Sequence, residues 1–554
     1  MSGFALSQEQ TEAVNSDSDR LMIVAPPGCG KTEILAHRAA YLVDSLEKNQ
    51  RVLALTFTNR ARLNLEERLR AVLGDARTRR YIVVRNFHGF AAQIVLAHGR
   101  TISLRMEDLK LPKTSTLRKA VVKVGGNESM LYDVERMLGE IKRHPFSDVE
   151  VLDALRKQPQ GQGRQLAEKV ERARQDANQL HYGDLLRHAQ CLLHIPAVAR
   201  LYQLHFGAVL VDEFQDLSLQ QLDLARLSCS SRQTFAGDPL QGIYSWAGAA
   251  PTEVEAEIRK NCTQTIRLHE SYRSSPRVLE AANSISEQII PGSSLVAAHQ
   301  ERWIDGGCSA SLVMHDLVQE AEVILSLATT ILSRDPTASV GIICRAGWRR
   351  NNIDRVFAKE TRFSVRRWEL AIDNPKVVSL IQSVVATLPH GTSIEDARLA
   401  VFDVMDPADV EMYGQVDEAF DVLEQSDAET AKAAIQSIRA SDPRQTIGPG
   451  VHLLNAHTGK GQQFDWVFIV GLEEGHLPSK RNSRGTALAE EQRVLLVMLS
   501  RARYGLVVTR VEMGSGNYGS YQTNKSRWWP MIKTKFTLKE QIEQHLRTYQ
   551  MCAC

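Results

Sequence analysis

Short apolar runs that lead into amphipathic segments recur along the first part of the chain. These runs span residues 21–25, 52–57 and 208–214. Helix-like segments begin near Lys31 and Thr58, directly after the first two runs. Apolar runs of this length predict buried strands, and their alternation with helices predicts a parallel α/β sheet. A second series of runs spans residues 311–317, 339–346, 451–455 and 464–472. The pattern therefore predicts two α/β units in one chain.

Two long stretches interrupt this alternation. From Phe90 to about Leu201 the pattern is helical and charged, which predicts a helical insertion in the first unit. Residues 389–450 interrupt the second unit, and within them residues 403–429 hold ten acidic residues and no Lys or Arg. A solvated helical face explains such a charge run, and so does a docking surface for a basic partner. The pattern alone leaves both interpretations open.

Length and composition restrict the classes of protein that fit. A chain of 554 residues exceeds the size at which one hydrophobic core stops growing. With 67 Lys and Arg against 65 Asp and Glu, the formal charge is +2, so nucleic acid would have to bind a local basic patch. The eight cysteines include no C-x-x-C pair, which argues against a zinc–thiolate site and suits a reducing compartment. No apolar stretch approaches the roughly 18 residues of a membrane helix, and the first residues lack a secretory pattern. We expect a cytoplasmic protein without a membrane partner.

A Gly-rich turn lies between the first predicted strand and the helix that follows it. It reads APPGCGKT over residues 25–32, with Ala25 at the position of the first glycine of the G-x-x-x-x-G-K-T pattern. Backbone amides of such a turn cradle phosphate oxygens, while Lys31 would neutralise the β and γ phosphates and Thr32 would ligate Mg²⁺. The segment predicts a phosphate-binding loop.

An acidic pair, Asp212 and Glu213, closes the third apolar run. One carboxylate at a strand end can hold Mg²⁺, and the next can accept a proton from an attacking water. A helix N-cap is the alternative for the pair taken alone. Together with the phosphate loop, the pair predicts a site for a nucleoside triphosphate and its metal ion.

Seven further segments precede and follow the phosphate loop and the acidic pair along the chain, in a characteristic order. They are residues 6–10, 53–61, 87–90, 237–249, 271–274, 455–465 and 490–503. With residues 25–32 and 211–216, they resemble the ordered motifs of the UvrD/Rep/PcrA group of superfamily 1 helicases over most of residues 6–503. The resemblance implies an α/β fold of two RecA-like parallel-sheet P-loop domains, with ATP and Mg²⁺ bound in the cleft between them.

The resemblance also assigns candidate residues to the ATP site. The catalytic residues that it implies are Lys31, Glu213, Gln241, Arg273 and Arg501. The implied nucleotide-binding residues are Gln10, Gly28, Gly30, Lys31, Thr32 and Gln463, and the implied metal ligands are Thr32 and Asp212. In these roles Glu213 is the base, Gln241 senses the γ-phosphate and the water, Gln10 reads the adenine and Gln463 contacts the sugar. The two arginines would stabilise transition-state charge at little reorganisation cost.

The same motifs imply a track for single-stranded DNA or for junctions between single and double strands. The implied DNA-contacting residues are Phe57, His88, Tyr244, Trp246 and His457. Stacking of a base on an aromatic ring is worth about 1–3 kcal/mol without sequence preference. Eight arginines from Arg60 to Arg85 lie along the same part of the chain. For any one of them, phosphate contact and a solvated helix face explain the charge equally well.

Motif spacing and the resemblance together predict domain boundaries. The predicted segments are 1–91 and 199–265 for the first RecA-like domain, 92–198 for a helical 1B-like insertion, 266–388 and 446–554 for the second RecA-like domain with the C-terminal tail, and 389–445 for a reduced, acidic 2B-like insertion. The larger relatives carry a sizeable domain at this last position. An acidic surface there would repel the phosphate backbone of DNA.

Two functions compete on this basis. The resemblance implies a DNA-stimulated ATPase that translocates on single strands in the 3′ to 5′ direction and separates duplexes. In its size and its reduced insertion, the chain also resembles the helicase-like GajB subunits of Gabija antiphage systems, which work beside a GajA-like nuclease of the OLD family. The alternative is therefore a regulatory subunit that senses ATP and DNA ends for a partner nuclease, and the residues that depart from the family pattern favour it: Pro27, Cys29, Ala247, Gln463 and Leu496. The intact catalytic residues favour the first function. A nucleotide kinase would not explain the later motifs.

Overall fold

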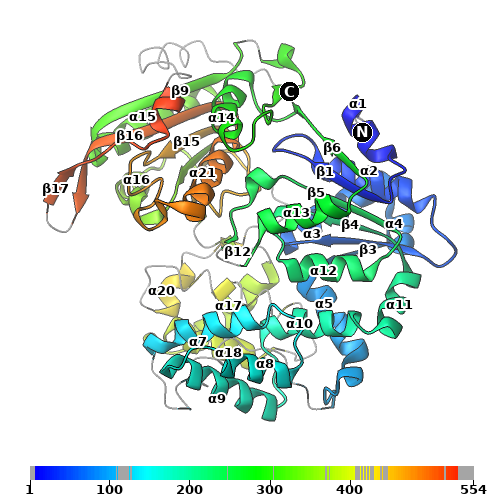
Figure 1. The fold of residues 1–554 in the computed structure, drawn as a ribbon. Coiled ribbons are helices and arrows are strands. Elements are labelled where there is room, and N and C mark those ends of the chain that lie inside the picture. The colour runs from blue at the N-terminus through cyan, green and yellow to red at the C-terminus, as the bar shows by residue number, and fades with distance from the viewer. Residues whose placement is uncertain are drawn as a thin grey trace.

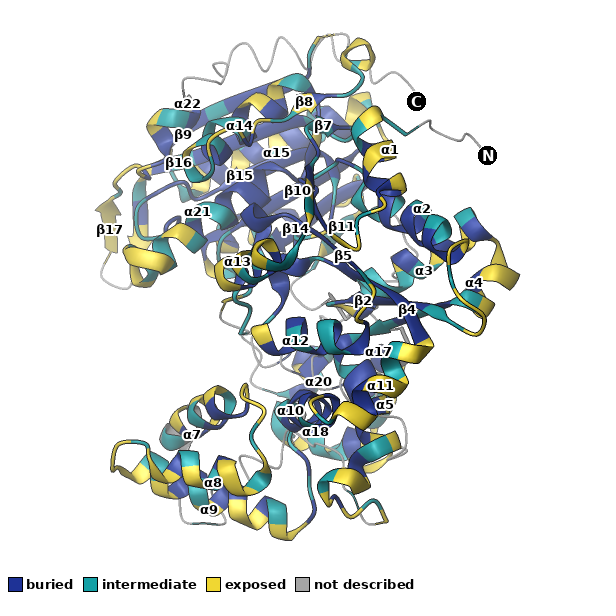
Figure 2. Ribbon diagram, turned by 45° about the vertical axis from the view of Figure 1, so that its right-hand side comes forward, coloured by how far each residue is buried: buried dark blue, intermediate teal, exposed yellow. Residues whose placement is uncertain are grey.

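Two sheet domains and two smaller helical bodies make up the protein in this computed structural model (Figure 1). The structure describes residues 6–107, 109, 121, 124, 128–245, 248–303, 305–368, 371–372, 375–405, 412, 416, 419–420, 423, 430–436, 439–440, 447–516 and 519–533. Figure 2 shows that the strands of both sheets are largely buried, whereas the helices of the insertions expose one face. In the described part of the chain, no helix is both long enough and apolar enough to cross a membrane.

The first sheet has six parallel strands in the order β3-β2-β4-β5-β1-β6. Their bounds are β1 Arg20–Val24, β2 Arg51–Thr56, β3 Ile82–Asn86, β4 Phe206–Asp212, β5 Arg232–Gly237 and β6 Gln264–Arg267. Side chains alternate between the two faces, so Ala208 and Leu210 of β4 enter one core cluster while Val209 and Val211 enter the other. The predicted strands at residues 21–25, 52–57 and 208–214 are confirmed.

Helices cover both faces of this sheet. One face packs against α1 Gln8–Asn15, α2 Lys31–Val43 and α3 Asn59–Leu73, with α4 Asp75–Tyr81 beside α3. The other face packs against α5 Phe87–His98, α10 Tyr182–Leu193, α11 Pro196–His205, α12 Leu219–Ser228 and α13 Pro251–Asn261. Two N-caps follow directly from site loops: the Thr58 hydroxyl accepts from Ala61 N at the start of α3, and Ser218 caps α12. These caps fix where the loops after β2 and β4 end.

The second sheet is also parallel, apart from one antiparallel strand. It runs β11-β14-β10-β15-β16, with β9 parallel and β17 antiparallel to β16. The bounds are β9 Cys308–Asp316, β10 Ser339–Cys344, β11 Val365–Arg367, β14 Gly450–Asn455, β15 Phe464–Val470, β16 Ala502–Gly516 and β17 Gly519–Gln522. One face packs against α14 Pro276–Ile289, α21 Gly485–Leu499 and α22 Trp529–Lys533, and the other against α15 Leu317–Arg334 and α16 Asn351–Phe357. A short parallel pair, β7 Glu270–Ser271 and β8 Val296–Ala297, lies between the domains in sequence. The predicted fold class, two parallel-sheet α/β units, is confirmed.

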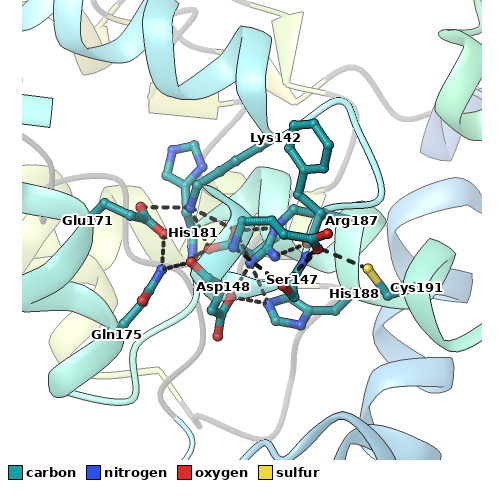
Figure 3. Close-up of polar contacts among 12 residues, drawn as sticks. Lys142, Ser147, Asp148, Glu171, Gln175, His181, Arg187, His188 and Cys191 are labelled. Atoms are coloured by element: carbon teal, nitrogen blue, oxygen red, sulfur yellow. Dashed lines mark hydrogen bonds and ion pairs between the residues drawn. The ribbon is translucent and has the colours of Figure 1, made fainter. Parts of the chain in front are cut away.

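The insertion in the first domain is helical, as predicted. Helices α7 Glu128–Ile141, α8 Asp148–Arg156 and α9 Gln162–Asp176 share a small apolar core of their own. A cluster of largely buried charged side chains joins this insertion to α10 (Figure 3). Since α10 also packs on α5 and α12, it ties the insertion to the first sheet domain.

The insertion in the second domain forms a separate helical body. Its elements are β12 Ala371–Ile372, α17 Pro375–Thr387, α18 Ile394–Asp403, α20 Ala431–Gln436 and β13 Arg439–Ala440. Helix α17 packs on α18 and α20 and contributes to the apolar core of this body. The body therefore begins before residue 389, the start that the sequence predicted. Val416, Phe420 and Leu423 are buried in the same core. The intervening acidic residues Asp417, Glu418 and Asp421 lie outside the described residues.

Candidate functional site

A cleft of about 1240 Å³ lies between the two sheet domains. It collects side chains that are far apart in the sequence, from the loops after β1 and β4 on one side and from the segments around α14 and α21 on the other. The predicted ATP-site residues that line it are Gly28, Gly30, Lys31, Thr32, Asp212, Glu213, Gln241, Arg273, Gln463 and Arg501. The cleft lies at the carboxyl ends of parallel strands, where ligands of open α/β sheets bind.

The Gly-rich turn after β1 depends on its glycines. Gly28 and Gly30 have φ angles of 86° and 79°, which L side chains rarely adopt. A Cβ on Gly28 would lie 2.5 Å from Ser271 Oγ and 2.7 Å from the Arg273 Cβ. Tyr272 N also donates to the Gly28 carbonyl at 2.9 Å. The turn is therefore packed directly against the segment that carries Arg273.

Gln10 is buried and donates a hydrogen bond to the backbone of this turn. Its Nε2 donates to the Cys29 carbonyl at 3.0 Å, and its Oε1 accepts from Ser7 N at 3.0 Å in a capping box at the start of α1. Gln10 does not line the cleft among the residues described there. Its role in reading adenine stays a prediction, while its support of the turn is visible.

Lys31 lies between the two carboxylates at the end of β4. Its Nζ is 2.6 Å from Asp212 Oδ1 and 2.5 Å from Glu213 Oε1. Burial alone would raise the pKa of Glu213, but the ammonium groups of Lys31 and Lys460 lower it to about 2. Burial raises the pKa of Asp212, and Glu213 adds to this while Lys31 opposes it. The Gly-rich turn and the acidic pair, which the sequence predicted to form one site, are therefore in direct contact.

Glu213 has a strained backbone that aims its side chain into the cleft. Its φ and ψ of 57° and 49° are left-handed, which is uncommon for a residue with a Cβ and occurs where a site requires it. Gln215 Nε2 donates to Glu213 Oε2 at 2.6 Å, and Gln215 Oε1 accepts from Asp238 N at 2.9 Å. Asp238 in turn accepts from Gln241 Nε2 at 3.1 Å. A continuous hydrogen-bond chain thus connects Glu213 with Gln241.

Two arginines of the second sheet domain complete the cleft. The Arg501 Nη2 donates to Gln241 Oε1 at 3.3 Å, and the Arg273 Nη1 donates to the Ser500 carbonyl at 3.4 Å. Burial and the nearby Arg273 lower the pKa of Arg501 to about 9, and burial and Arg503 lower that of Arg273 to about 10. Within the described part of the chain, neither guanidinium forms an ion pair with a carboxylate. Clustered cations without counter-charges favour an anionic ligand.

Lys460, which the sequence analysis did not single out, bridges the two domains. Its Nζ is 2.6 Å from Asp216 Oδ1 and 2.8 Å from the Gln241 carbonyl, and it lies 4.7 Å from the ring centre of Tyr244. The first sheet domain supplies all three contacts, whereas Lys460 belongs to the loop after β14. The sequence did contain a signal for this residue, because Lys460 lies between Gly459 and Gly461 within the predicted motif at residues 455–465.

The amide of Gln463 has a cationic neighbour. Arg503 Nη2 donates to Gln463 Oε1 at 3.3 Å, and Arg503 Nη1 lies 3.6 Å from Asp465 Oδ1. Gln463 and Arg503 both line the cleft. A sugar contact by Gln463 stays a prediction.

Three of the predicted DNA-contacting rings form a row, and two of them, Phe57 and Tyr244, line the cleft. Phe57 stacks on Tyr244 with ring centres 5.8 Å apart, and Tyr244 lies 6.1 Å from His457. Burial lowers the pKa of His88 to about 4, and burial with the nearby Arg345 lowers that of His457 to about 4, so both rings are neutral at pH 7. His88 lies at the start of α5. Trp246 lies outside the described residues.

Comparison with known proteins identifies the family. Residues 6–261 match the UvrD/REP helicase N-terminal domain, and residues 410–513 match the UvrD-like helicase C-terminal domain. The chain is 28% identical to the ATP-dependent DNA helicase UvrD2 of Mycobacterium tuberculosis over 91% of this chain and 78% of that protein. It is 24% identical to DNA helicase II of Salmonella typhimurium, over 92% of this chain and 84% of that protein. A third match, ATP-dependent DNA helicase PcrA of Leuconostoc citreum, is 30% identical over 50% of this chain and 39% of that protein.

The matched relatives span both sheet domains, and the cleft between those domains holds most of the ATP-site residues that the ordered motifs single out. The chain belongs to the UvrD/Rep/PcrA-like superfamily 1 ATP-dependent DNA helicases.

Proposed function

We propose that this chain hydrolyses ATP to move along single-stranded DNA, in the 3′ to 5′ direction, and that the movement separates strands at junctions with duplex DNA. One arrangement carries the proposal: Lys31 and Glu213 of the first sheet domain line the same cleft as the two arginines of the second. A triphosphate held from both sides draws the domains together, and hydrolysis releases them. The direction rests on the resemblance of the motifs alone.

Each side of the cleft has a distinct part in the reaction that we propose. Lys31 neutralises the β and γ phosphates after it leaves the carboxylates that now hold it. Glu213 takes a proton from the attacking water, and Gln241 orients that water through the hydrogen-bond chain that links the two residues. Arg273 and Arg501 meet the negative charge that spreads over the equatorial oxygens in a loose transition state.

Mg²⁺ fits the oxygen groups at the bottom of the cleft. Asp212 and Thr32 both line it and offer a carboxylate and a hydroxyl, the hard ligands that Mg²⁺ prefers. The described residues hold no group of three or more His, Cys, Asp or Glu that could bind a metal alone. The ion would therefore take its remaining ligands from phosphate and water, and it would supply neutralisation of the phosphate charge.

ATPase activity with and without single-stranded DNA, followed by unwinding of a forked duplex, tests this function. Trp246→Ala is expected to reduce stimulation by single-stranded DNA more than it reduces the basal rate, because a lost stacking contact weakens DNA binding without touching the phosphate site. An equal loss of both rates would identify Trp246 as a core residue. A wild-type rate that DNA does not change would reject the proposed function itself.

A second candidate function is regulation of a nuclease in antiviral defence, as in the GajB subunits that this build resembles. The compact helical body between β11 and β14 favours it, because a small insertion leaves the adjoining surface of the second sheet domain to another protein. The acidic sequence around residues 403–429 would repel DNA and attract a basic partner. In this role the chain would sense ATP and DNA ends and unwind little DNA itself.

Co-purification from the native host with a tagged chain distinguishes the two functions. We expect recovery of a nuclease-type subunit of the OLD family, and we expect charge reversal at Asp417, Glu418 and Asp421 to weaken assembly while ATPase activity stays within a few fold. Recovery of the chain alone, as a monomer that unwinds DNA processively, would reject the regulatory role and leave an autonomous helicase.

A further inference from the structure

A solvent-exposed tryptophan stands on the second sheet domain, outside the cleft. Trp348 is 58% exposed and is the only Trp or Phe among the large apolar side chains that are exposed in the described part of the chain. It lies in the short helix after β10, Gly347–Arg350. Its ring centre is 4.7 Å from that of His476, with the planes inclined by 48°. An exposed indole without a covering element marks a surface that a flat, apolar ligand can use.

Trp348 and His476 line a small pocket. The pocket has a volume of about 190 Å³, and its lining includes Arg345, Arg349 and Ser479. Of the lining residues, Arg349 is buried and forms ion pairs with Glu320 Oε2 at 2.6 Å and Glu473 Oε1 at 2.9 Å. Burial and Arg349 lower the pKa of His476 to about 4, so its ring is neutral at pH 7. The pocket therefore presents two uncharged rings beside an arginine that two carboxylates hold in place.

The segment that follows the pocket residue Ser479 is basic. Lys480, Arg481 and Arg484 follow Ser479 in the sequence and are exposed. None of the three forms an ion pair with a carboxylate among the described residues. Exposed rings beside cations without counter-charges are the combination with which proteins bind single-stranded nucleic acid, since the rings stack on bases and the cations meet phosphates.

One side chain of this pocket also acts on a ring of the row Phe57, Tyr244 and His457. Arg345, which lines the pocket, lies close enough to His457 to help lower its pKa. Arg345 is also fixed by a bidentate contact to Glu491, at 3.0 Å from Nε and 2.8 Å from Nη2 to Oε1. Glu491 accepts from Ser479 N at 3.2 Å as well. One buried carboxylate thus fixes both Arg345 and Ser479 of the pocket.

We propose that Trp348 and His476 form a base-stacking subsite for single-stranded DNA on the second sheet domain. It continues the row Phe57, Tyr244 and His457, whose first two members belong to the first domain. The DNA then has a stacking contact on each sheet domain, and cleft closure changes the distance between the two contacts. This inference rests on the proposed function, because it needs a single strand in the track.

The binding of a fluorescein-labelled oligo(dT) to the full chain without nucleotide, followed by anisotropy, tests the subsite. Trp348→Ala is expected to weaken binding about 5- to 160-fold, which is the loss of one stacked base at about 1–3 kcal/mol, and Trp348→Phe is expected to retain most of the affinity. Tyr521→Ala is the matched control, because Tyr521 is 46% exposed on β17 and we assign it no contact with DNA. The basal ATPase rate should not change in any of these variants.

An abasic strand of the same length separates stacking from a structural effect. Wild type and Trp348→Ala should bind it equally, because it offers no base to stack. Equal binding of oligo(dT) by wild type and Trp348→Ala would overturn the subsite, and so would an equal loss on both strands. If DNA fails to stimulate the wild-type ATPase, the proposed function fails instead, and that measurement does not involve Trp348.

Discussion

Replacing Lys31 with Ala is expected to lower ATP turnover about 100- to 1000-fold, because a fixed cation at the transferred phosphate contributes that much to transition-state stabilisation. ATP binding should also weaken roughly 10- to 100-fold, since Lys31 contacts the phosphates in the ground state as well. Binding of a fluorescent ATP analogue and steady-state phosphate release measure the two effects separately. Lys48→Ala, at an exposed position after α2, is the matched control and should behave as wild type.

Glu213→Gln should separate binding from turnover. The amide keeps the shape of the side chain and removes the proton acceptor, so turnover is expected to fall about 100- to 10,000-fold while ATP affinity stays close to wild type. In wild type the low pKa of Glu213 keeps it ionised at neutral pH and able to accept the proton. Glu47→Gln, exposed near the same end of α2, is the control. Wild-type turnover in both Lys31→Ala and Glu213→Gln would move the ATP site elsewhere.

The parts of the site that could be predicted from the sequence are local. The turn at residues 25–32 needs a strand, glycines and a helix start in succession, and all three are visible in the sequence within a dozen residues. The same holds for Asp212 and Glu213 at the end of an apolar run. Sheet order then brings these two segments together, because β1 and β4 are separated only by β5.

The contacts that the sequence did not predict join distant segments through single side chains. Lys460 contacts Asp216, and Arg345 contacts Glu491, across gaps of more than a hundred residues. Nothing in the local pattern selects one acidic partner over another when many are present. The extension of the second insertion to α17 was missed for a related reason: its apolar positions have the same period as those of a helix that covers a sheet.

The buried charges between the helical insertion and α10 carry a large expected effect on stability (Figure 3). Asp184 lies at the centre of this cluster and accepts from Lys142 at 2.9 Å, from Arg174 at 3.2 Å and from Arg187 at 3.0 Å. Burial would raise the pKa of Asp184, but these cations hold it well below the ordinary value. Because the pKa is lowered in the folded state, the stabilisation is complete at neutral pH and is lost only as the pH falls below about 4.

Asp184→Asn is therefore expected to leave three buried cations short of a counter-charge, at a cost of about 3–5 kcal/mol. Asp153→Asn, which breaks an exposed pair with Arg156 at 2.8 Å on α8, should cost less than about 1 kcal/mol. Because the chain has several domains, hydrogen exchange of the amides in α7 to α9 measures the effect better than a global melting curve.

The lower stability of the insertion in Asp184→Asn should also affect the residues that we propose to contact DNA. Gln220 of α12 donates to the Lys142 carbonyl at 3.2 Å, and α12 follows the loop that carries Glu213. On the other side, the Arg143 guanidinium lies 2.8 Å from where a Cβ on Gly248 would stand, at the end of the loop that bears Tyr244. A loosened insertion releases this loop but leaves Lys31 and Arg501 in place, so stimulation by single-stranded DNA should fall while the basal ATPase rate stays close to wild type. If the amides of α9 exchange as slowly in Asp184→Asn as in wild type, the cluster adds no stability. If they exchange faster but single-stranded DNA still stimulates the ATPase as in wild type, the insertion and the loop that bears Tyr244 are not coupled.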